Sequence, residues 1–444
     1  MKDVIAIFDI GKTNKKFLLF DLNLALVYEI QTQFTEITDD DGDPCDDIES
    51  ILKWMNSQIE KIQKGRQFQI LAINFSTHGA GLIYIDEHGQ RVSPLYNYLK
   101  KIKGVDFEAF YEKQNGKDEF SRKTASPAYG MLNSGLQILW FKNRKPKMWK
   151  QVKNILHYPQ YLSYTFTEKI TSDFTSIGAH TAMWDFDKMN YHRWLNEENI
   201  SVLHPDSVKQ NQLIDLNGNS VIVGSGMHDS SASLIPFIKK YQKQEFVLVS
   251  SGTWILCMNP FSKEPLTINQ LTNNCLCFMT PEKKQVKSNM QMLGWVHNLN
   301  VKEISSFFNV AEDTFKNVEV NQNICKKIFD ENKFEFFQKG IPENYLGNLK
   351  NLNRFKNFNL AYHQFMFELT SFVAKAINMI LDCDSDLKDI FVTGGFNKNQ
   401  LFTAYLSLFF PNQKIIKSNI QNASALGAAM MMAEAIEKNN KINS

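Results

Sequence analysis

The chain lacks the features that would place it in a membrane or on a nucleic acid. No window of its 444 residues holds the roughly 18 apolar residues that a membrane-spanning helix needs. The first apolar run, Val4 to Phe8, is short and Asp9 follows it at once, so we expect no signal peptide. The net charge is only +2, and Lys and Arg are scattered along the chain. We therefore expect a soluble, cytoplasmic protein without nucleic-acid or membrane partners.

Cysteine is scarce, and several common enzyme signatures are missing. The six cysteines are dispersed, and the close pair Cys275 and Cys277 has no second pair at a matching spacing. We expect reduced, half-buried strand cysteines rather than a metal site. The chain contains no Gly-x-x-x-x-Gly-Lys-Ser/Thr loop, no Gly-x-Gly-x-x-Gly fingerprint and no His-Glu-x-x-His motif. These absences exclude the familiar phosphate-loop, dinucleotide-binding and zinc-protease signatures.

What is present is the composition of a large globular enzyme. Hydrophobic residues make up 43% of the chain and charged residues 22%, which argues against disorder. A chain of 444 residues is too long for one ordinary hydrophobic core, so two domains are expected. The charged stretch at 239–245 marks the boundary. We predict an N-terminal domain over residues 1–240 and a C-terminal domain over residues 241–444.

The two halves open with the same pattern. Val4–Phe8, Phe17–Phe20 and Leu26–Ile30 read as strands of an antiparallel meander joined by short polar turns. Phe246–Ser251 and Trp254–Met258 repeat the order of strand, Gly/Thr turn and strand. The repetition indicates an internal duplication. Further elements are expected as strands at 69–76, 82–86 and 389–393, and as helices within 134–164, over 359–382, from Asn399 and over 424–438.

Two turns have the residues that phosphate and metal require. Asp9 ends a buried strand and is followed by Gly11 and Thr13. Glycine lets the main chain approach a phosphate, a hydroxyl can donate to its oxygens, and a carboxylate can hold hydrated Mg²⁺. Gly252 and Thr253 form a similar turn in the second half. Each could be an ordinary hairpin, but the pair suggests a clamp on a triphosphate.

Small residues mark two further places. Gly394 and Gly395 leave a strand and precede a helix, where they would let adenine or ribose lie against the main chain. The alternative is a strand end that merely needs small residues. In the run 425–429, Ala-Leu-Gly-Ala-Ala, the small side chains favour close helix packing over catalysis.

Asp229 is the candidate general base. It follows an apolar run and the segment Gly-Ser-Gly-Met-His, at a predicted helix start where the helix dipole keeps a carboxylate ionised. Such a carboxylate can orient a sugar hydroxyl and accept its proton during phosphoryl transfer. The alternative is that Asp229 only caps the helix, because Asp is a favoured N-cap residue. His228 beside it is expected to pack or to support the site.

The order of these motifs resembles the FGGY carbohydrate kinases along nearly the whole chain. It runs Asp-x-Gly-x-Thr-Asn, Ser-Thr-His-Gly, Gly-x-His-Asp, Ser-Gly-Thr-Trp, Thr-Gly-Gly and Ala-Leu-Gly-Ala-Ala, with the stretch 157–185 similar to the end of that family's sugar-domain insert. Within the family, DIGKTN, GMHDSSAS and SSGTW look closest to fuculokinases and rhamnulokinases.

The resemblance implies an α/β fold of two ribonuclease H-like domains of the actin-like ATPase superfold, with the active site in the cleft between them. It also implies ATP and Mg²⁺, with a sugar as the other substrate. The implied roles are Asp229 as base, Asp9 for the metal, Thr13, Asn14, Lys16, Gly252 and Thr253 for phosphates, Gly394, Gly395 and Asn397 for adenosine, and His78, Gly79, Tyr98, His228 and Asp229 for the sugar.

The sugar side departs from the family pattern. Relatives often have Arg where this chain has Lys16, and many have a Trp-x-Asp-x-Arg-like segment where it reads Tyr-Asn-Tyr98-Leu-Lys. We expect a terminal hydroxyl of a ketose or deoxyketose, such as L-fuculose or L-rhamnulose, as acceptor. Alternatives are a xylulose or polyol kinase, or a non-catalytic sugar or nucleotide sensor. A homodimer is possible, although the aromatic stretch 406–410 fits core better than a dimer face.

Overall fold

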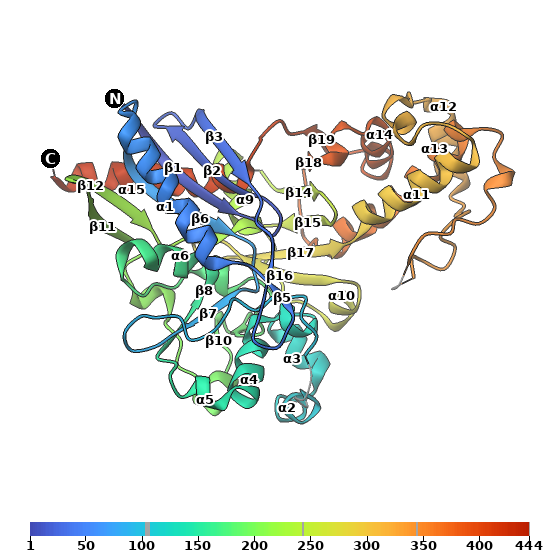
Figure 1. Cartoon of the computed structure of the whole chain (residues 1–444). Helices are drawn as coiled ribbons and strands as arrows, with labels where there is room; N and C mark the ends of the chain where they lie inside the picture. The colour runs from blue at the N-terminus through green and yellow to red at the C-terminus, as the bar shows by residue number, and fades with distance from the viewer. Residues whose placement is uncertain (103–106, 242–243, 343–344, 444) are drawn as a thin grey trace.

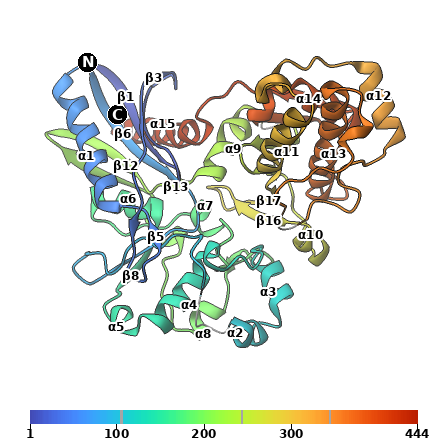
Figure 2. The ribbon, with the colours of Figure 1, turned by 45° about the vertical axis from the view of Figure 1, so that its right-hand side comes forward.

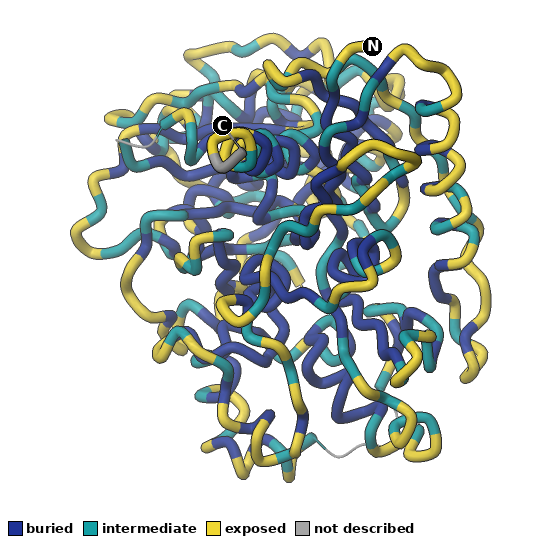
Figure 3. The backbone as a smooth tube through the Cα atoms, turned by 90° about the vertical axis from the view of Figure 1, so that its left-hand side faces the viewer, coloured by how far each residue is buried: buried dark blue, intermediate teal, exposed yellow. Residues whose placement is uncertain are grey.

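The computed structural model of the chain describes residues 1–102, 107–241, 244–342 and 345–443. Two mixed β-sheets lie side by side, each between layers of helices (Figure 1). This arrangement confirms the expected α/β fold class. Buried backbone runs through the middle of the molecule, and exposed segments lie mainly in the outer loops (Figure 3).

The first sheet is built around the predicted N-terminal meander. Its strands run in the order β11-β12-β6-β1-β2-β3. β1, β2 and β3 are antiparallel, whereas β6 runs parallel to β1, β12 and the short β13. Val4–Phe8 is buried on both faces of the sheet, as its continuous apolar character predicts. The strands are β1 (Lys2–Ile10), β2 (Lys15–Asp21), β3 (Leu26–Thr32), β6 (Phe68–Thr77), β11 (Asn211–Leu216), β12 (Asn219–Gly224) and β13 (Met227–His228).

The second sheet repeats this path. Its strands run in the order β16-β17-β15-β14-β18-β19. β14, β15 and β17 form the antiparallel meander, and β18 and β19 run parallel to β14. The shared path supports the duplication that the sequence indicates. The strands are β14 (Phe246–Ser251), β15 (Ile255–Asn259), β16 (Cys275–Met279), β17 (Gln285–Gln291), β18 (Asp389–Gly394) and β19 (Lys414–Lys417).

Helices cover both faces of each sheet. α1 (Ile48–Gly65) and α6 (Tyr158–Thr167) pack on one face of the first sheet. The outer face of the second sheet is covered by α11 (Leu293–Phe307), α12 (Gln322–Glu331), α13 (Phe358–Met379) and α14 (Gln400–Phe409). Leu406 and Phe410 lie in this core, which supports the core interpretation of the stretch 406–410.

A lobe inserted between β6 and α7 (Phe174–Ile177) lies below the first sheet (Figure 2). It has its own core, in which Tyr84 and Phe141 stack and Trp140 and Trp194 are buried. Its elements are β7 (Leu82–Ile85), α2 (Phe107–Lys113), α3 (Lys117–Lys123), α4 (Ser134–Arg144), α5 (Pro146–Trp149) and β8 (Asn154–His157). The small elements that follow α7 are β9 (Trp184–Asp185), β10 (Asn190–Tyr191) and α8 (Trp194–Glu197).

The last helix of each half lies between the two sheets. α15 (Ala423–Asn443) follows the second sheet along the chain, yet its Ala428 and Met432 pack on β1 of the first. α9 (Asp229–Lys240) follows the first sheet and places Leu234 and Phe237 against the second. The helices cross closely, because a Cβ at Gly427 would overlap the carbonyl oxygen of Ala232.

The close crossing supports the packing interpretation of the small residues at 425–429. Since α9 and α15 are shared between the halves, the division at residue 240 stays a prediction.

Two other expectations can be compared with the fold. No helix in the described part of the chain is long and apolar enough to cross a membrane. All six cysteines are free thiols, and five of them are buried. Cys275 and Cys277 lie on β16 as expected, whereas Cys325 lies on α12 and Cys383 is exposed.

Candidate active site

The carboxyl ends of three parallel strands bring the candidate carboxylates together. Asp9 pairs with Ser76 of β6, and Ser76 pairs with Met227 of β13, two residues before Asp229. Parallel strands end at the same edge of a sheet, and ligands of open α/β sheets bind there. Asp9 and Asp229, which are 220 residues apart in the sequence, therefore share one site.

Asp9 lies at the end of β1 in a poorly solvated position. Burial and the charge of Asp229 raise the pKa of Asp9 to about 6, although hydrogen bonds from Ser424 and Ser76 act in the other direction. The Ser424 hydroxyl, at the start of α15, donates to Asp9 Oδ2 at 3.1 Å. The C-terminal helix thus contributes to the site. We did not predict Ser424, which directly precedes the small-residue run.

Asp229 begins α9, and its carboxylate is partly exposed. About a third of its side chain is exposed, compared with 4% of the His228 side chain. Its Oδ1 accepts a hydrogen bond from the Ser230 amide at 2.6 Å and lies 3.3 Å from His228 Nε2. Burial raises the pKa of Asp229, and the neighbouring His78 partly opposes that rise. Burial also lowers the pKa of His228 to about 3, so the ring beside Asp229 is neutral.

The predicted sugar-side residues lie around Asp229. The His78 ring lies between Tyr98 and Tyr158, with centroid distances of 5.5 Å to each, and its Nδ1 is 2.9 Å from the Gly79 carbonyl. Burial lowers the pKa of His78, and the neighbouring Asp46 and Asp229 act in the other direction. A Cβ at Gly79 would lie only 3.2 Å from the His228 ring. The structure therefore brings these predicted residues to one side of the cleft.

A charged cluster that we did not predict anchors the first turn. Lys12 Nζ is 2.6 Å from Glu36 Oε1 and 3.1 Å from Asp46 Oδ2. The buried Lys15 donates to the Lys12 carbonyl at 2.8 Å and lies 3.4 Å from Asp46 Oδ1. His78 Nε2 is 3.9 Å from Asp46 Oδ2. Asp46 thus lies between the first turn and His78, and no sequence motif marks it.

The remaining predicted residues of the first turn face different ways. Thr13 is exposed, and Asn14 Oδ1 accepts a hydrogen bond from Gln33. Lys16 Nζ donates to Asn422 Oδ1 at 2.7 Å and lies 3.5 Å from Glu29. Lys16 therefore binds the segment just before α15, which joins the two halves of the molecule beside the site.

The second turn follows β14 of the second sheet, as the first turn follows β1 of the first sheet. The Gly252 amide donates to the Trp254 carbonyl at 2.8 Å, and a Cβ at Gly294 would overlap the Gly252 carbonyl oxygen. The N-terminus of α11 therefore lies directly against this turn. Ser251 Oγ donates to the Thr393 carbonyl and accepts the Phe396 amide at 2.9 Å. Ser251 thus holds together the turn at Gly252 and Thr253 and the turn at Gly394 and Gly395.

Gly394 must be glycine, because its φ is +76° and a Cβ would overlap the Ser251 carbonyl oxygen. At Gly395 a Cβ would meet no described atom within 4 Å. Gly395 therefore presents bare main chain to open space, as contact with a flat ring would require.

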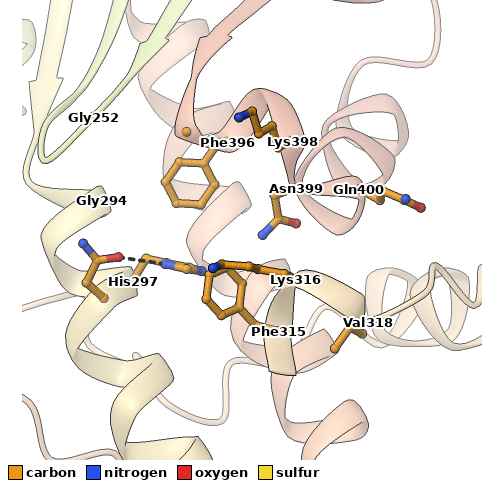
Figure 4. A pocket seen from close by; sticks show the side chains of 12 residues that line it. Gly252, Gly294, His297, Phe315, Lys316, Val318, Phe396, Lys398, Asn399 and Gln400 are labelled. Carbon is orange, nitrogen blue, oxygen red and sulfur yellow. Dashed lines mark hydrogen bonds between the residues drawn. The ribbon is translucent and has the colours of Figure 1, made fainter. Parts of the chain in front are cut away.

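A pocket of about 420 Å³ opens beside these glycines, between α11 and the start of α14 (Figure 4). Gly252 and Gly395 line it, together with Lys316 and Lys398. The buried His297 packs edge-on against Phe396, and burial lowers its pKa to about 4, so it is neutral. The remaining lining residues are Gly294, Asn298, Phe315, Val318, Phe396, Asn399 and Gln400.

The pocket has the size, the ring-lined wall and the cationic side chains that a nucleotide needs. Asn397 turns away from it, and its amide donates to the Ser418 carbonyl at 2.7 Å. The assignment of Asn397 to adenosine binding stays a prediction. We did not predict the residues of α11 or Lys316 and Lys398, because they follow no motif.

Comparison with solved structures relates this fold to sugar and polyol kinases. A carbohydrate kinase from Novosphingobium aromaticivorans is similar at 20% identity, covering 96% of this chain and 91% of its own, with a TM-score of 0.78. A ligand-bound xylulose kinase from Lactobacillus acidophilus is similar at 16% identity, covering 98% and 90%, with a TM-score of 0.76. Plasmodium falciparum glycerol kinase with ADP is similar at 15% identity, covering 98% and 90%, with a TM-score of 0.69. At these identities the likeness concerns the fold.

The sequence itself provides the link to a family. Residues 4–202, which contain the turn after Asp9 and the segment around His78, match the N-terminal domain of the FGGY family of carbohydrate kinases. The rest of the chain continues the same two-sheet fold. Residues 4–202 thus match one domain of the FGGY family, and the two-sheet fold of the whole chain is similar to that of solved carbohydrate and xylulose kinases.

Proposed function

We propose that this protein transfers the γ-phosphoryl group of ATP to a terminal hydroxyl of a ketose, with Asp229 as general base. The observation that carries this proposal is the position of Asp229 at the start of α9. Its partly exposed carboxylate lies near Asp9 and His78, at the sheet edge where the first turn and the residues assigned to the sugar meet. A residue that only capped α9 would need neither a second carboxylate beside it nor a partly exposed side chain.

Asp229 would act on the acceptor hydroxyl. Its raised pKa makes it a stronger proton acceptor than an ordinary carboxylate, and a base is most effective when its pKa approaches the working pH. The Ser230 amide donates to Oδ1, and the neutral His228 ring lies 3.3 Å from it, which would limit the directions the carboxylate can take. The proton of the sugar hydroxyl would pass to Asp229 as its oxygen attacks the γ-phosphorus.

Asp9 is the residue that we assign to Mg²⁺. The donors at this edge are carboxylate and hydroxyl oxygens, which are the ligands that Mg²⁺ prefers. Burial and the charge of Asp229 make an ionised Asp9 unfavourable, and a bound cation would relieve that cost. The residues therefore fit the ion, which when bound would neutralise charge on the phosphates.

We assign the nucleotide to the second half. The main chain at Gly252 and Thr253 would contact the phosphates from one side, with Thr13, Asn14 and Lys16 on the other. The pocket beside Gly395 would hold adenosine, with Lys316 and Lys398 close to the phosphates. Gly394 supports this main chain, and Asn397 braces the turn through Ser418.

The acceptor is proposed as a ketose or deoxyketose such as L-fuculose or L-rhamnulose, bound by His78, Gly79, Tyr98 and His228. A second candidate is a xylulose or polyol, favoured by the structures of similar fold, which include xylulose, gluconate and glycerol kinases. The position of Tyr98 beside His78 suits either, because an aromatic ring can pack on the apolar face of a sugar.

The test is ADP release from MgATP across a panel of deoxyhexuloses, pentuloses, aldoses and polyols. Strong stimulation by a deoxyketose would support both the reaction and the substrate. Stimulation by xylulose or glycerol would keep the reaction and replace the substrate. If no sugar raised ADP release above background while ATP still bound, the sensor alternative would replace the kinase.

A further inference from the structure

The loop that leads to Asp229 is held by buried side chains of α6, β6 and α7. Ser163 of α6 donates to the Gly224 carbonyl at 2.7 Å, and Gln160 donates to the Gly226 carbonyl at 2.8 Å. Asn74 of β6 accepts the Gly226 amide at 3.1 Å. These three side chains are 0 to 3% exposed. The loop is therefore fixed by polar contacts that lie out of the solvent.

The last of these contacts lies next to the candidate base. The His228 amide donates to Thr175 Oγ1 at 3.0 Å, and the Thr175 hydroxyl donates in turn to Asp173 Oδ1. The Thr175 side chain is fully buried, and Asp173 is 7% exposed. A chain of two hydrogen bonds thus runs from Asp173 to the main chain of the residue before Asp229.

A helix cap alone does not account for Asp173. Its Oδ1 also accepts the Thr175 amide at 2.9 Å, which caps α7, but α7 is only four residues long. Burying a carboxylate is costly, and here burial raises the pKa of Asp173 to about 6. The Thr175 hydroxyl can accept from His228 in a fixed direction only while its own proton is bound by Asp173. The carboxyl group therefore orients the hydroxyl.

We propose that Thr175 and Asp173 are positioning residues for the general base: their hydrogen bonds hold the His228 main chain and thereby fix where the Asp229 carboxylate stands. This inference rests on the proposed kinase function. The proposed role concerns geometry only. For the position of Asp229, the charge on Asp173 therefore matters less than its acceptor oxygen does.

The experiment compares Thr175→Val, Thr175→Ser and Thr171→Val. Valine keeps the shape of Thr175 but removes the hydroxyl, whereas serine keeps the hydroxyl. Thr171→Val is the matched control, because Thr171 Oγ1 is buried and has no hydrogen-bond partner among the described residues. Asp173→Asn keeps an acceptor oxygen, and Asp173→Val removes it.

We expect Thr175→Val and Asp173→Val to lower kcat by about 10- to 100-fold, the size of a small misplacement of a catalytic group. KM for ATP should stay within about twofold of the unmodified protein, since the pocket assigned to adenosine and the turn at Gly252 lie on the second sheet. Thr175→Ser, Asp173→Asn and Thr171→Val should keep most of kcat. Equal losses of kcat for Thr175→Val and Thr171→Val, or no rescue by serine, would overturn the proposal.

A second measurement does not depend on activity. Hydrogen exchange of the segment 224–232 should become faster in Thr175→Val and stay unchanged in Thr171→Val, because only the former frees the His228 amide. Unchanged exchange in Thr175→Val would overturn the inference even if the kinase were active. Faster exchange in a protein without sugar-dependent ADP release would contradict the proposed function and leave the structural role of Thr175 intact.

Discussion

The two halves of the molecule share a strand path and differ in the chemistry at the same edge. In the first sheet, Asp9 stands beside Ser76 where β1 and β6 end. In the second sheet, Ser250 pairs with Thr393 at the equivalent place, and glycines follow. The first edge thus holds carboxylates and the second offers hydroxyl groups and bare main chain. Under the proposed function, one fold serves once for catalysis and once for nucleotide binding.

The same contrast holds for the helices that follow. α9 begins with Asp229, whereas α15 begins with Ala423 and Ser424. Ser424 reaches across to Asp9 of the other half. The second half therefore supports the carboxylates of the first without providing a base of its own. Substitutions at matching positions of the two halves test this difference.

The largest effect is expected for Asp229→Asn. Removing a general base commonly costs about 10²- to 10⁴-fold, so kcat should fall by that order while ATP binding stays nearly intact. Sugar-dependent ADP release gives kcat, and calorimetry gives the ATP affinity. Glu60→Gln on the surface of α1 is the control, with a side chain 62% exposed. Unchanged turnover in Asp229→Asn would contradict the assignment.

A smaller loss of kcat is expected for Asp9→Asn, and a still smaller loss for Ser250→Ala at the equivalent position of the second sheet. Asp9→Asn should lower kcat by about 100-fold, a typical loss for one contact to charge in the transition state. Ser250→Ala, at the matching point of β14, should stay within about threefold because it removes no charge. Titration of each variant with Mg²⁺ adds a second readout, in which only Asp9→Asn needs more metal. Equal losses in both variants would remove the distinction between the edges.

Substitutions of the neighbouring glycines of the second half should change different quantities, KM for ATP at Gly395 and the stability at Gly394. Gly395→Ala fills open space, so it should raise KM for ATP by about tenfold, the value of 1.4 kcal/mol, without changing Tm. Gly394→Ala should instead lower the stability by about 1–3 kcal/mol, because its φ is +76°. Thermal unfolding and ATP-dependent kinetics distinguish the two. A loss of stability at Gly395→Ala would show that this glycine serves packing.

The smallest effect concerns pH. The pKa of Asp9 is raised to about 6, so activity should fall as the pH drops below about 6 and Asp9 takes up a proton. Stability should change in the opposite sense. A carboxyl with a raised folded pKa binds more protons when folded, so its destabilising effect is lost as the pH falls from about 6 towards 4.

Asp9→Asn should therefore have a higher Tm than the unmodified protein at pH 7, and the difference should shrink towards pH 4. Thermal unfolding at several pH values measures it. A difference that does not change with pH would mean that Asp9 keeps an ordinary pKa.

Much of the fold was predictable because its elements are defined locally. The buried run Val4–Phe8, the Gly/Thr turns and the helix start at Asp229 each follow from a few adjacent residues. The strands β17 and β19 escaped prediction, as did β11. β19 is only four residues long, and β17 mixes Lys, Ser and Asn with two apolar residues, so neither has a clear period-two pattern.

Local periodicity and backbone preference encode the strand-turn-strand units, the glycine turns and the carboxylates at strand and helix ends, so these could be read from neighbouring residues alone. Folding was needed to place α15 on the first sheet, to bring Ser424 to Asp9 across 415 residues, and to let Thr175 hold the His228 main chain. Such pairings arise when distant segments bury their apolar faces together, and no local pattern specifies which segments will meet.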